Sequence, residues 1–437
     1  MKTEAYGKIL TALLLSGEVD MKKYLLFIFI TSMLLCNCSF NDEAVQVRNS
    51  GKPKKLTVMV YMAADNDLES FALENLKAME AADCKDTNVL VLLDRSDEYD
   101  ETNGNWTDSR LFQVIHDGSG DNTIKSKRLS CPQLGLLESE NTELDMASPK
   151  TLQHFIEYGK KNFEADNYAL IIWGHGSGWK AFCIDDRTDS FMTVKELGDA
   201  VRGQGLCVIG FDTCFGCVFE NIYELKDCAE YTVACPGVTD GRGWNYKTLL
   251  EKLSSAGTSA YDIAGAMAVN SYTQNTIIDN SKVEELFISF EDFAKQLADR
   301  ILERDTQYSV FNSLCNCKSY FSNHNPCEIY LDIYSMAELY SFDFDSCINP
   351  RLKESAEELK KKINKTCLST QNTNGEIGIH FIPKTASGAF ATTHSIDYIK
   401  DSRRNDQSSF IQKSQYWVPT IKGNSCSILD KLFYTSF

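Results

Sequence analysis

Two reactive side chains directly follow apolar, strand-like stretches of the sequence. His175 lies among glycines in WGHGSGW, after the run YALII, and Cys214 lies in GFDTCFGC, after the run LCVI. A cysteine thiolate is a strong nucleophile once a neighbouring imidazole has taken its proton. The two residues therefore predict acyl-transfer chemistry, with Cys214 as the nucleophile and His175 as the base.

Either residue alone would favour a structural role. A histidine in HGSG is commonly a turn residue, and a single cysteine is commonly a small buried apolar residue. The pair favours catalysis because ligands of open α/β sheets bind at the carboxyl ends of the strands. Ser177 is not a candidate nucleophile, since a Gly-x-Ser-x-Gly pattern requires a glycine where His175 stands.

The glycines around the histidine suit a site that stabilises negative charge. A carbonyl under attack needs backbone N–H donors directed at its developing oxyanion, and glycine allows such close approach. We predict the N–H groups of Gly176 and Cys214 as these donors. The alternative is that the glycines merely form a turn.

Asp212 stands two residues before Cys214. A carboxylate at a strand end beside a nucleophile would attract a cationic group of the substrate. A helix N-cap and a partner that orients His175 are the alternatives.

The surrounding sequence alternates strand and helix patterns. Strand-like runs occupy 56–64, 88–95, 109–115, 168–176, 206–214 and 231–237, and helical patterns occupy 65–82, 148–163, 193–203 and 218–229. Asp65 or Asp67 would cap the first of these helices. Near-continuous apolar strands separated by amphipathic helices indicate a sheet covered on both faces. We therefore predict an α/β fold, a three-layer α/β/α sandwich with a mostly parallel sheet.

Beyond residue 246 the patterns are mostly helical, notably over 281–302 and 350–363, and one late strand is expected at 376–383. The predicted organisation is an upstream extension (1–20), an export segment (21–38), a linker (39–55), an α/β domain with His175 and Cys214 (56–256) and a mainly helical C-terminal subdomain packed on the sheet (257–437).

The export segment predicts where the protein resides. It has a methionine followed by two lysines, a short apolar stretch, and then small and polar residues with cysteines. Leu35 stands three residues before Cys38, as in a bacterial lipoprotein box, so we predict Cys38 as the lipidated residue and a lipid-anchored protein of the cell envelope. Asn37 departs from that pattern and Cys36 is a competing choice. An ordinary cleaved signal is the alternative.

The composition of the chain limits the classes of molecule that it can bind. The 437 residues are 43% hydrophobic and carry a formal charge of −17, which argues against a nucleic-acid surface. The 16 cysteines lack the spacing of a disulfide framework, so most should be buried free thiols. The negative charge fits a cationic or neutral partner better, and we expect a monomer.

The order of the motifs supports a more specific assignment. TVMVYMAADNDLE, ALIIWGHGSGW, IGFDTCFGCVFENIYELKDCAEYTVA, GRGWNY and GIHFIP resemble, in that order, the motifs of the clostripain family of cysteine peptidases, which has a caspase-like fold. The resemblance runs from about residue 56 to beyond residue 383. It implies that protein or peptide substrates are the partners, that His175 and Cys214 are catalytic, and that Asp212 lines a pocket for Arg or Lys before the cut.

One position departs from the family's pattern. Where relatives often carry a second acidic residue between glycines, this chain has Arg242, which could pair with Asp212 and cancel the pocket's charge. Asp240, two residues earlier, is a candidate substitute. Basic specificity is therefore expected but depends on Arg242.

The resemblance also implies precursor processing between the histidine and cysteine strands. Lys180 and Arg187 are candidate self-cleavage sites, or else solvated loop charges. Some relatives depend on Ca²⁺, for which Asp185 and Asp186 are candidate ligands. Two carboxylates fall far short of a coordination shell, so no metal site is assigned and Ca²⁺ remains an option.

Two other functions fit the sequence less well. A catalytically silent, peptide-binding surface lipoprotein would use the same fold, but the presence of both His175 and Cys214 favours the enzyme. A metal-dependent hydrolase would need convergent ligands, and no HExxH-like spacing occurs.

Overall fold

The computed structural model describes residues 53–269, 274–301, 310, 313–321, 329–341, 349–368, 376–381, 410, 413–415 and 417. They belong to one compact unit, Asn49–Phe437. The predicted export segment, with Cys36 and Cys38, lies outside the described residues.

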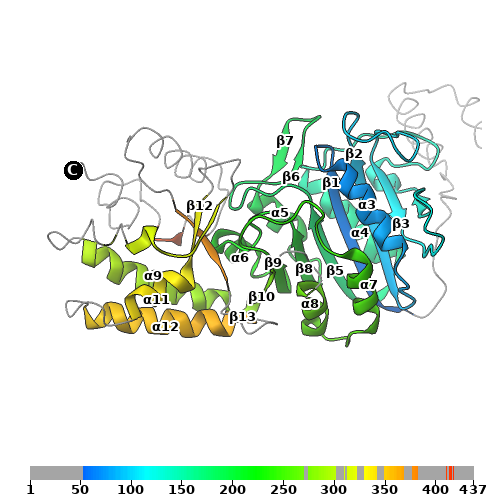
Figure 1. The fold of residues 1–437 in the computed structure, drawn as a ribbon. Coiled ribbons are helices and arrows are strands. Elements are labelled where there is room, and N and C mark those ends of the chain that lie inside the picture. The colour runs from blue at the N-terminus through cyan, green and yellow to red at the C-terminus, as the bar shows by residue number, and fades with distance from the viewer. Residues whose placement is uncertain are drawn as a thin grey trace, which may run out of the picture. The chain divides into compact units, whose positions relative to one another are not determined.

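A nine-stranded sheet forms the centre of the molecule (Figure 1). Its strand order is β13-β10-β9-β8-β5-β1-β2-β3-β4. The bounds are β1 (Lys54–Ala64), β2 (Thr87–Arg95), β3 (Arg110–Gln113), β4 (Lys127–Leu129), β5 (Ala165–Trp173), β8 (Leu206–Asp212), β9 (Ala229–Ala234), β10 (Thr276–Asp279) and β13 (Cys367–Leu368). The five central strands, β9 to β2, pair in parallel, and the outer strands pair antiparallel. The prediction of a mostly parallel sheet is confirmed.

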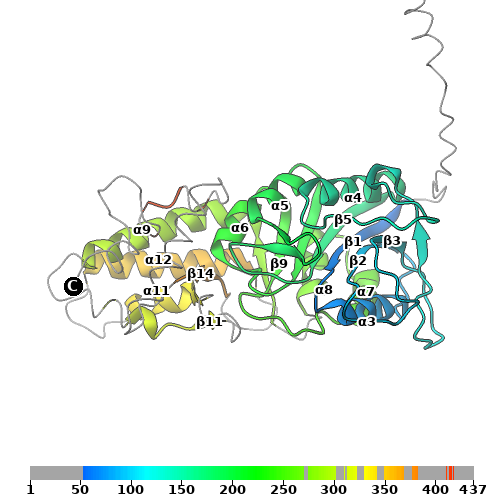
Figure 2. The ribbon, with the colours of Figure 1, turned by 90° about the horizontal axis from the view of Figure 1, so that it is seen from above.

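Helices cover both faces of this sheet (Figure 2). One layer contains α4 (Pro149–Asn162), α5 (Val194–Val201) and α6 (Phe219–Leu225), and the other contains α3 (Glu69–Glu80), α7 (Tyr246–Ser255) and α8 (Ala260–Ala268). The strands supply both interfaces because their side chains alternate: Tyr61 belongs to the core with the first layer, and Val60 and Met62 belong to the core with the second. The predicted three-layer sandwich is confirmed.

The helix boundaries follow local signals. Pro149 begins α4, where a missing N–H costs nothing. The Thr193 side chain caps α5 and forms a reciprocal capping box with Glu196. The predicted cap of α3 is wrong, because its N-cap residue is Leu68 and no side chain makes a capping bond there.

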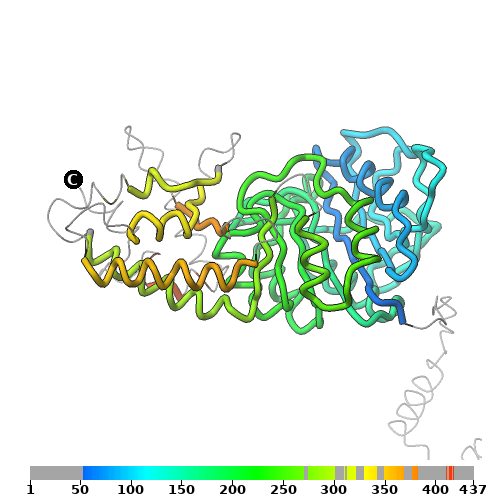
Figure 3. The backbone as a smooth tube through the Cα atoms, turned by 60° about the horizontal axis from the view of Figure 1, so that its bottom comes forward, coloured from blue at the N-terminus to red at the C-terminus, as the bar shows by residue number. Residues whose placement is uncertain are grey.

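The C-terminal part is less purely helical than the sequence suggested. It contains η2 (Asn280–Lys282), α9 (Val283–Ile301), α11 (Ile333–Ser341) and α12 (Pro350–Thr366), and α9 and α12 lie side by side (Figure 3). It also extends the main sheet with β10 and β13, and it forms a second, three-stranded sheet from β11 (Ser319–Phe321), β12 (Ile329–Asp332) and β14 (Gly378–His380). The expectation of a single late strand was therefore wrong.

A short hairpin follows the histidine loop. It consists of β6 (Phe182–Asp185) and β7 (Ser190–Met192). A 3₁₀ turn, η1 (Pro132–Leu134), precedes α4.

The helices were compared in length and polarity with a membrane span. Within the described ranges, they are all too short or too polar to cross a membrane. The cysteines in those ranges are free, and most are buried, which agrees with the expectation of buried thiols.

Candidate active site

The strand register places the two predicted catalytic residues at neighbouring strand ends. Strands β5 and β8 are parallel neighbours, and Trp173 pairs with Asp212. His175 and Cys214 each stand two residues beyond that pair. Both side chains are partly exposed. The structure thus brings the histidine and cysteine loops to the same edge of the sheet.

Close backbone packing joins these two loops. A Cβ added at Gly176 would collide with the carbonyl oxygen of Cys214 and lie 2.9 Å from the Cβ of Thr213. Only glycine permits this approach. The loop also bends at Gly174 and Gly178, whose φ angles of 134° and 57° are positive.

A buried amide that the sequence analysis missed ties the same loops together. Asn221, on α6, donates from Nδ2 to the carbonyl oxygens of Gly178, at 3.2 Å, and of Phe215 and Gly216, at 3.3 Å. One side chain therefore holds carbonyls from both the histidine loop and the cysteine loop. Nothing in the sequence pattern distinguishes this asparagine from a surface residue of an amphipathic helix.

His175 has a carboxylate partner that the sequence analysis assigned to another role. The Nε2 atom of His175 lies 2.6 Å from Oδ1 of Asp67. The two side chains are 37% and 66% exposed. Asp67 follows β1, the strand adjacent to β5, so its position beside the histidine depends on the sheet order. The predicted alternative, that Asp212 orients the histidine, is not the contact observed.

Cys214 lies at the edge of a tightly bonded turn. Its Sγ accepts a hydrogen bond from the N–H of Thr239 at 3.4 Å. The next residue, Phe215, has a positive φ of 53°, and its N–H donates to Gly237 O at 2.8 Å. A buried non-glycine residue in this conformation is strained, so the chain beyond the cysteine is held in an unusual turn.

Asp212 is fully buried below this turn. Its Oδ2 accepts hydrogen bonds from the Trp244 N–H and the Tyr246 hydroxyl, both at 2.9 Å. Burial raises the pKa of Asp212 to about 7, and the two hydrogen bonds oppose this shift only in part. Its Oδ1 has no hydrogen-bond partner among the described residues. The carboxylate therefore anchors the 244–246 segment through one oxygen and leaves the other buried and unpaired.

The other predicted pocket residues pair with each other. Nε of Arg242 donates to Oδ1 of Asp240 and Nη2 donates to Oδ2, both at 2.8 Å. This arginine holds the pKa of Asp240 down at about 2. The Arg242 side chain is 57% exposed.

The two predicted self-cleavage residues differ in their surroundings. Lys180 is exposed in a tight turn between Ser177 and Ala181. Arg187 lies in the β6–β7 turn, and its guanidinium forms ion pairs with carboxylates on three segments: Asp65 at 3.6 Å, Asp97 at 3.8 Å and Glu143 at 3.0 Å.

The two carboxylates considered for Ca²⁺ have different surroundings. Asp185 accepts hydrogen bonds from the Met146 and Thr188 N–H groups, at 3.2 and 2.9 Å. Asp186 is exposed.

Two comparisons of the sequence with known proteins point to the same family. A family model described as the clostripain family matches residues 60–414. The clostripain of Hathewaya histolytica is 28% identical over 243 residues, which cover 49% of this chain and 45% of that protein. The aligned part thus spans less than half of this relative.

Solved structures resemble the fold over most of the chain. An inactive zymogen of a C11 protease from Parabacteroides distasonis aligns with a TM-score of 0.55 and 19% identity, covering 80% of this chain and 99% of that one. A secreted C11 cysteine protease from Bacteroides thetaiotaomicron, in complex with an irreversible peptide inhibitor, aligns with a TM-score of 0.53 and 16% identity, covering 80% and 98%. At these low sequence identities, the two comparisons show a shared fold.

Proposed function

Because the chain belongs to the clostripain family of cysteine peptidases, we propose that it hydrolyses peptide bonds through an acyl-enzyme formed on Cys214. The observation that carries this proposal is the parallel register of β5 and β8, which sets His175 and Cys214 equally far beyond a paired position. Close packing of Gly176 on Cys214 supports it.

The proposed reaction has two steps. His175 takes the thiol proton, and the Cys214 thiolate attacks the scissile carbonyl carbon. The C–N bond breaks as the imidazolium gives its proton to the leaving amine. A water molecule, deprotonated by His175, then hydrolyses the thioester and frees Cys214.

Asp67 has a positioning role in this scheme. Its bond to Nε2 of His175 leaves Nδ1 for proton exchange with the thiol. The carboxylate also stabilises the imidazolium that forms during each step.

The oxyanion donors are the N–H groups of Gly176 and Cys214. In the turn after His175, the bond to Ala181 O comes from the Ser177 N–H, so this turn does not require the Gly176 N–H. The close packing of Gly176 on Cys214 supports this assignment, because one oxyanion needs both donors nearby.

The substrate class is proposed to be peptides with Arg or Lys before the cut. Oδ1 of Asp212 is buried without a partner, so it would accept the cationic group once substrate binding exposes it. Pairing of Arg242 with Asp240 supports this version of the pocket, because the arginine's charge is then partly balanced by a carboxylate other than Asp212.

A peptidase assay tests the proposal directly. Fluorogenic peptides ending in Arg or Lys should be cleaved by the purified chain, and Cys214→Ala or a thiol alkylator should abolish cleavage. His175→Ala should be nearly as inactive, and the double variant should be no slower than either single one. Peptide binding without turnover by the unmodified chain would instead support the silent binding protein.

Export and lipid anchoring through Cys38 form a separate proposal. Support comes from the sequence of the segment and from the secreted nature of the Bacteroides thetaiotaomicron protease of the same fold. Cys38→Ser should move the protein from the membrane fraction to the soluble fraction and remove lipid labelling. Retained labelling would point to Cys36.

Self-processing is proposed at Lys180 in preference to Arg187. Lys180 is exposed, whereas Arg187 is held by three carboxylates. Mass spectrometry of the purified chain should find a cut after Lys180 that Lys180→Ala removes and Arg187→Ala does not. A cut that persists in Cys214→Ala would be foreign proteolysis.

A further inference from the structure

We propose that a cavity beside the cysteine turn receives an apolar side chain of the substrate, from the residue that precedes the basic residue at the cut. The cavity has a volume of about 320 Å³ and is lined by residues 235–238, Gln274, Ser319, Tyr320 and Glu376. This volume is at the small end of the range of ligand pockets, so it suits one side chain rather than a cofactor. The inference rests on the proposed peptidase function and adds a second specificity position to it.

One wall of the cavity is the segment that holds the cysteine turn in place. The N–H of Phe215 donates to Gly237 O at 2.8 Å. Two residues beyond Gly237, the N–H of Thr239 donates to Sγ of Cys214 at 3.4 Å. The wall formed by residues 235–238 therefore directly adjoins the turn that carries the nucleophile.

The opposite wall is held by the second sheet. The ring of Tyr320, on β11, lies against Gly237, where an added Cβ would contact its Cδ1 at 3.4 Å. The Tyr320 hydroxyl lies 3.0 Å from Oδ2 of Asp332 and 3.2 Å from Oε2 of Glu376. The carbonyl oxygen of Glu376 accepts a hydrogen bond from Sγ of Cys217 at 3.3 Å. Contacts at both ends of the ring fix its position, so this wall is formed before a substrate binds.

The surface of the cavity favours an apolar group. Pro236, Val238 and the Tyr320 ring contribute apolar surface, and Val238 is 49% exposed. The carboxylate that lines the cavity, Glu376, forms an ion pair with Lys318. An apolar side chain bound here would remove apolar surface from water, whereas a cationic side chain would lose water without gaining an unbalanced carboxylate.

The strand order decides which part of the substrate reaches the cavity. Strands β9, β8 and β5 are consecutive neighbours, so the segment after β9 lies on one side of Cys214 and His175 lies on the other. His175 gives its proton to the leaving amine, so the part of the substrate that follows the cut lies toward β5. The part that stays on Cys214 as the acyl group therefore extends toward β9 and the cavity.

The two faces of the sheet decide which residue of the acyl group is concerned. Trp244 and Tyr246, the partners of Asp212, belong to the core with α3, α7 and α8, whereas Tyr320 packs against the other core. Successive side chains of an extended peptide point to opposite sides. With the basic side chain directed to Asp212, the side chain of the preceding residue is directed toward the cavity.

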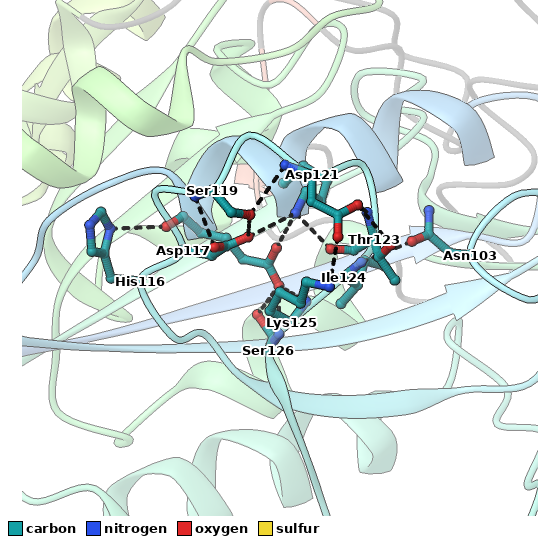
Figure 4. Close-up of polar contacts among 11 residues, drawn as sticks. Asn103, His116, Asp117, Ser119, Asp121, Thr123, Ile124, Lys125 and Ser126 are labelled. Atoms are coloured by element: carbon teal, nitrogen blue, oxygen red, sulfur yellow. Dashed lines mark hydrogen bonds and ion pairs between the residues drawn. The ribbon is translucent and has the colours of Figure 1, made fainter.

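A matched control position lies at the opposite edge of the sheet. Ile115 is 46% exposed, which is close to the exposure of Val238. It follows β3, which runs antiparallel to β2 and therefore ends away from the cysteine. The next loop, 116–126, is held by its own contacts, such as the ion pair of Asp121 with Lys125 at 2.9 Å (Figure 4). Ile115→Asp thus adds the same charge as Val238→Asp at a distant site.

Equilibrium binding to the full chain carrying Cys214→Ala tests the cavity without relying on turnover. Fluorescein-labelled peptides with one Arg should differ only in the residue before it, which is Leu, Gly or Lys. We expect the Leu peptide to bind about 10- to 100-fold more tightly than the Gly peptide, as burial of an aliphatic side chain implies. The Lys peptide should bind no more tightly than the Gly peptide.

Variants on this background locate the site. Val238→Asp should bring the Kd values of the Leu and Gly peptides close together and tighten binding of the Lys peptide, because a carboxylate replaces apolar surface. Ile115→Asp should keep the parent's preference for Leu. Thermal unfolding would confirm that both variants fold.

The outcomes separate this inference from the proposed function. Equal binding of the Leu and Gly peptides by the parent, absence of binding at millimolar peptide, or an unchanged Leu preference in folded Val238→Asp would overturn the cavity assignment. A Leu preference that Val238→Asp removes, together with no hydrolysis of any peptide by the unmodified chain, would support the cavity and contradict the peptidase function.

Discussion

At the scale of single residues, the contact between His175 and Asp67 can be tested for its role. Asp67 either orients the histidine ring for catalysis or merely stabilises the fold. The carboxylate is 66% exposed, so solvent screens its charge and its substitution should not unfold the chain. What it provides is a fixed ring orientation and a charge beside the imidazole.

We therefore expect Asp67→Asn to lower kcat by roughly tenfold, with KM nearly unchanged. This loss is smaller than the ~10⁴ associated with buried triad carboxylates, because the pair is exposed. Asp67→Glu should recover part of kcat, and Asp67→Ala should be slower than Asp67→Asn. Steady-state kinetics on one Arg peptide would measure all three. Equal losses of kcat in the three variants would indicate a merely structural residue.

The raised pKa of Asp212 predicts that substrate binding depends on pH. Because burial raises its pKa to about 7, the carboxylate is mostly neutral below that pH and ionised above it. A cationic substrate side chain should bind the ionised form better, so KM for Arg peptides should fall as the pH rises from about 6 to about 8.

Asp212→Asn should remove this pH dependence and lower kcat/KM for Arg peptides by about 10- to 100-fold, the effect of one charge-assisted hydrogen bond. Peptides with a neutral side chain at that position should change little and serve as the control. The basic-pocket assignment would be wrong if Arg and neutral peptides lost the same factor.

The sequence could reveal the reactive residues of the site but not their partners. His175 and Cys214 follow apolar runs, which mark strand ends without any tertiary information. Asp67 precedes a helix, where an aspartate is normally a cap, and its contact with the histidine depends on β1 lying beside β5. Asn221 resembles any polar residue of a helix until the two loops that it holds are placed.

At the scale of elements, the site depends on how closely the histidine loop approaches the cysteine loop. Gly176→Ala would place a methyl group against the Cys214 carbonyl and 2.9 Å from Thr213. Backbone atoms cannot move aside as a flexible side chain can, so the loops must separate.

We expect Gly176→Ala to reduce kcat/KM by at least 100-fold while circular dichroism remains native, since effective catalysis requires reacting groups within about 3–3.5 Å. Gly265→Ala is the matched control, because a Cβ at that helical position meets nothing within 4 Å. It should leave activity unchanged and slightly raise stability. Near-normal activity of Gly176→Ala would contradict the proposed geometry.

The elements that the sequence predicted are those with long apolar runs or helical periodicity. Strands β1, β2, β5, β8 and β9 were found for this reason. Strands β10 and β13 are short and pair antiparallel with partners far along the chain. Their formation depends on the neighbouring strand more than on their own composition, so local patterns could not reveal them.

At the scale of the whole molecule, buried acids make stability depend on pH. Burial raises the pKa of Asp212 to about 7 and of Asp332 to about 6. A raised acid pKa means that the folded state resists ionisation, so the stability that these two groups contribute is fully present below the unfolded pKa of about 4 and is lost as the pH rises through the folded values.

The free energy of unfolding, measured by urea denaturation in EDTA, should therefore be lower at pH 8 than at pH 5. Asp212 alone should account for a difference on the order of 2 kcal/mol. Asp212→Asn should reduce the difference, and Asp121→Asn, at an exposed position, should not. Equal stability of the unmodified protein at both pH values would show that these carboxyls are not desolvated as the fold implies.

Residues 376–380, late in the sequence, form hydrogen bonds with the segment that follows the cysteine. Gly378 donates its N–H to Cys217 O at 3.0 Å, Cys217 Sγ donates to Glu376 O at 3.3 Å, and His380 donates its N–H to Glu220. Tyr330 fills the space beside Gly178 in the histidine loop. A chain still emerging during synthesis or translocation, with residues 376–380 not yet available, lacks these supports for both reactive loops. Such long-range contacts form last. The order of chain synthesis therefore delays the completion of both reactive loops until residues 376–380 have been made.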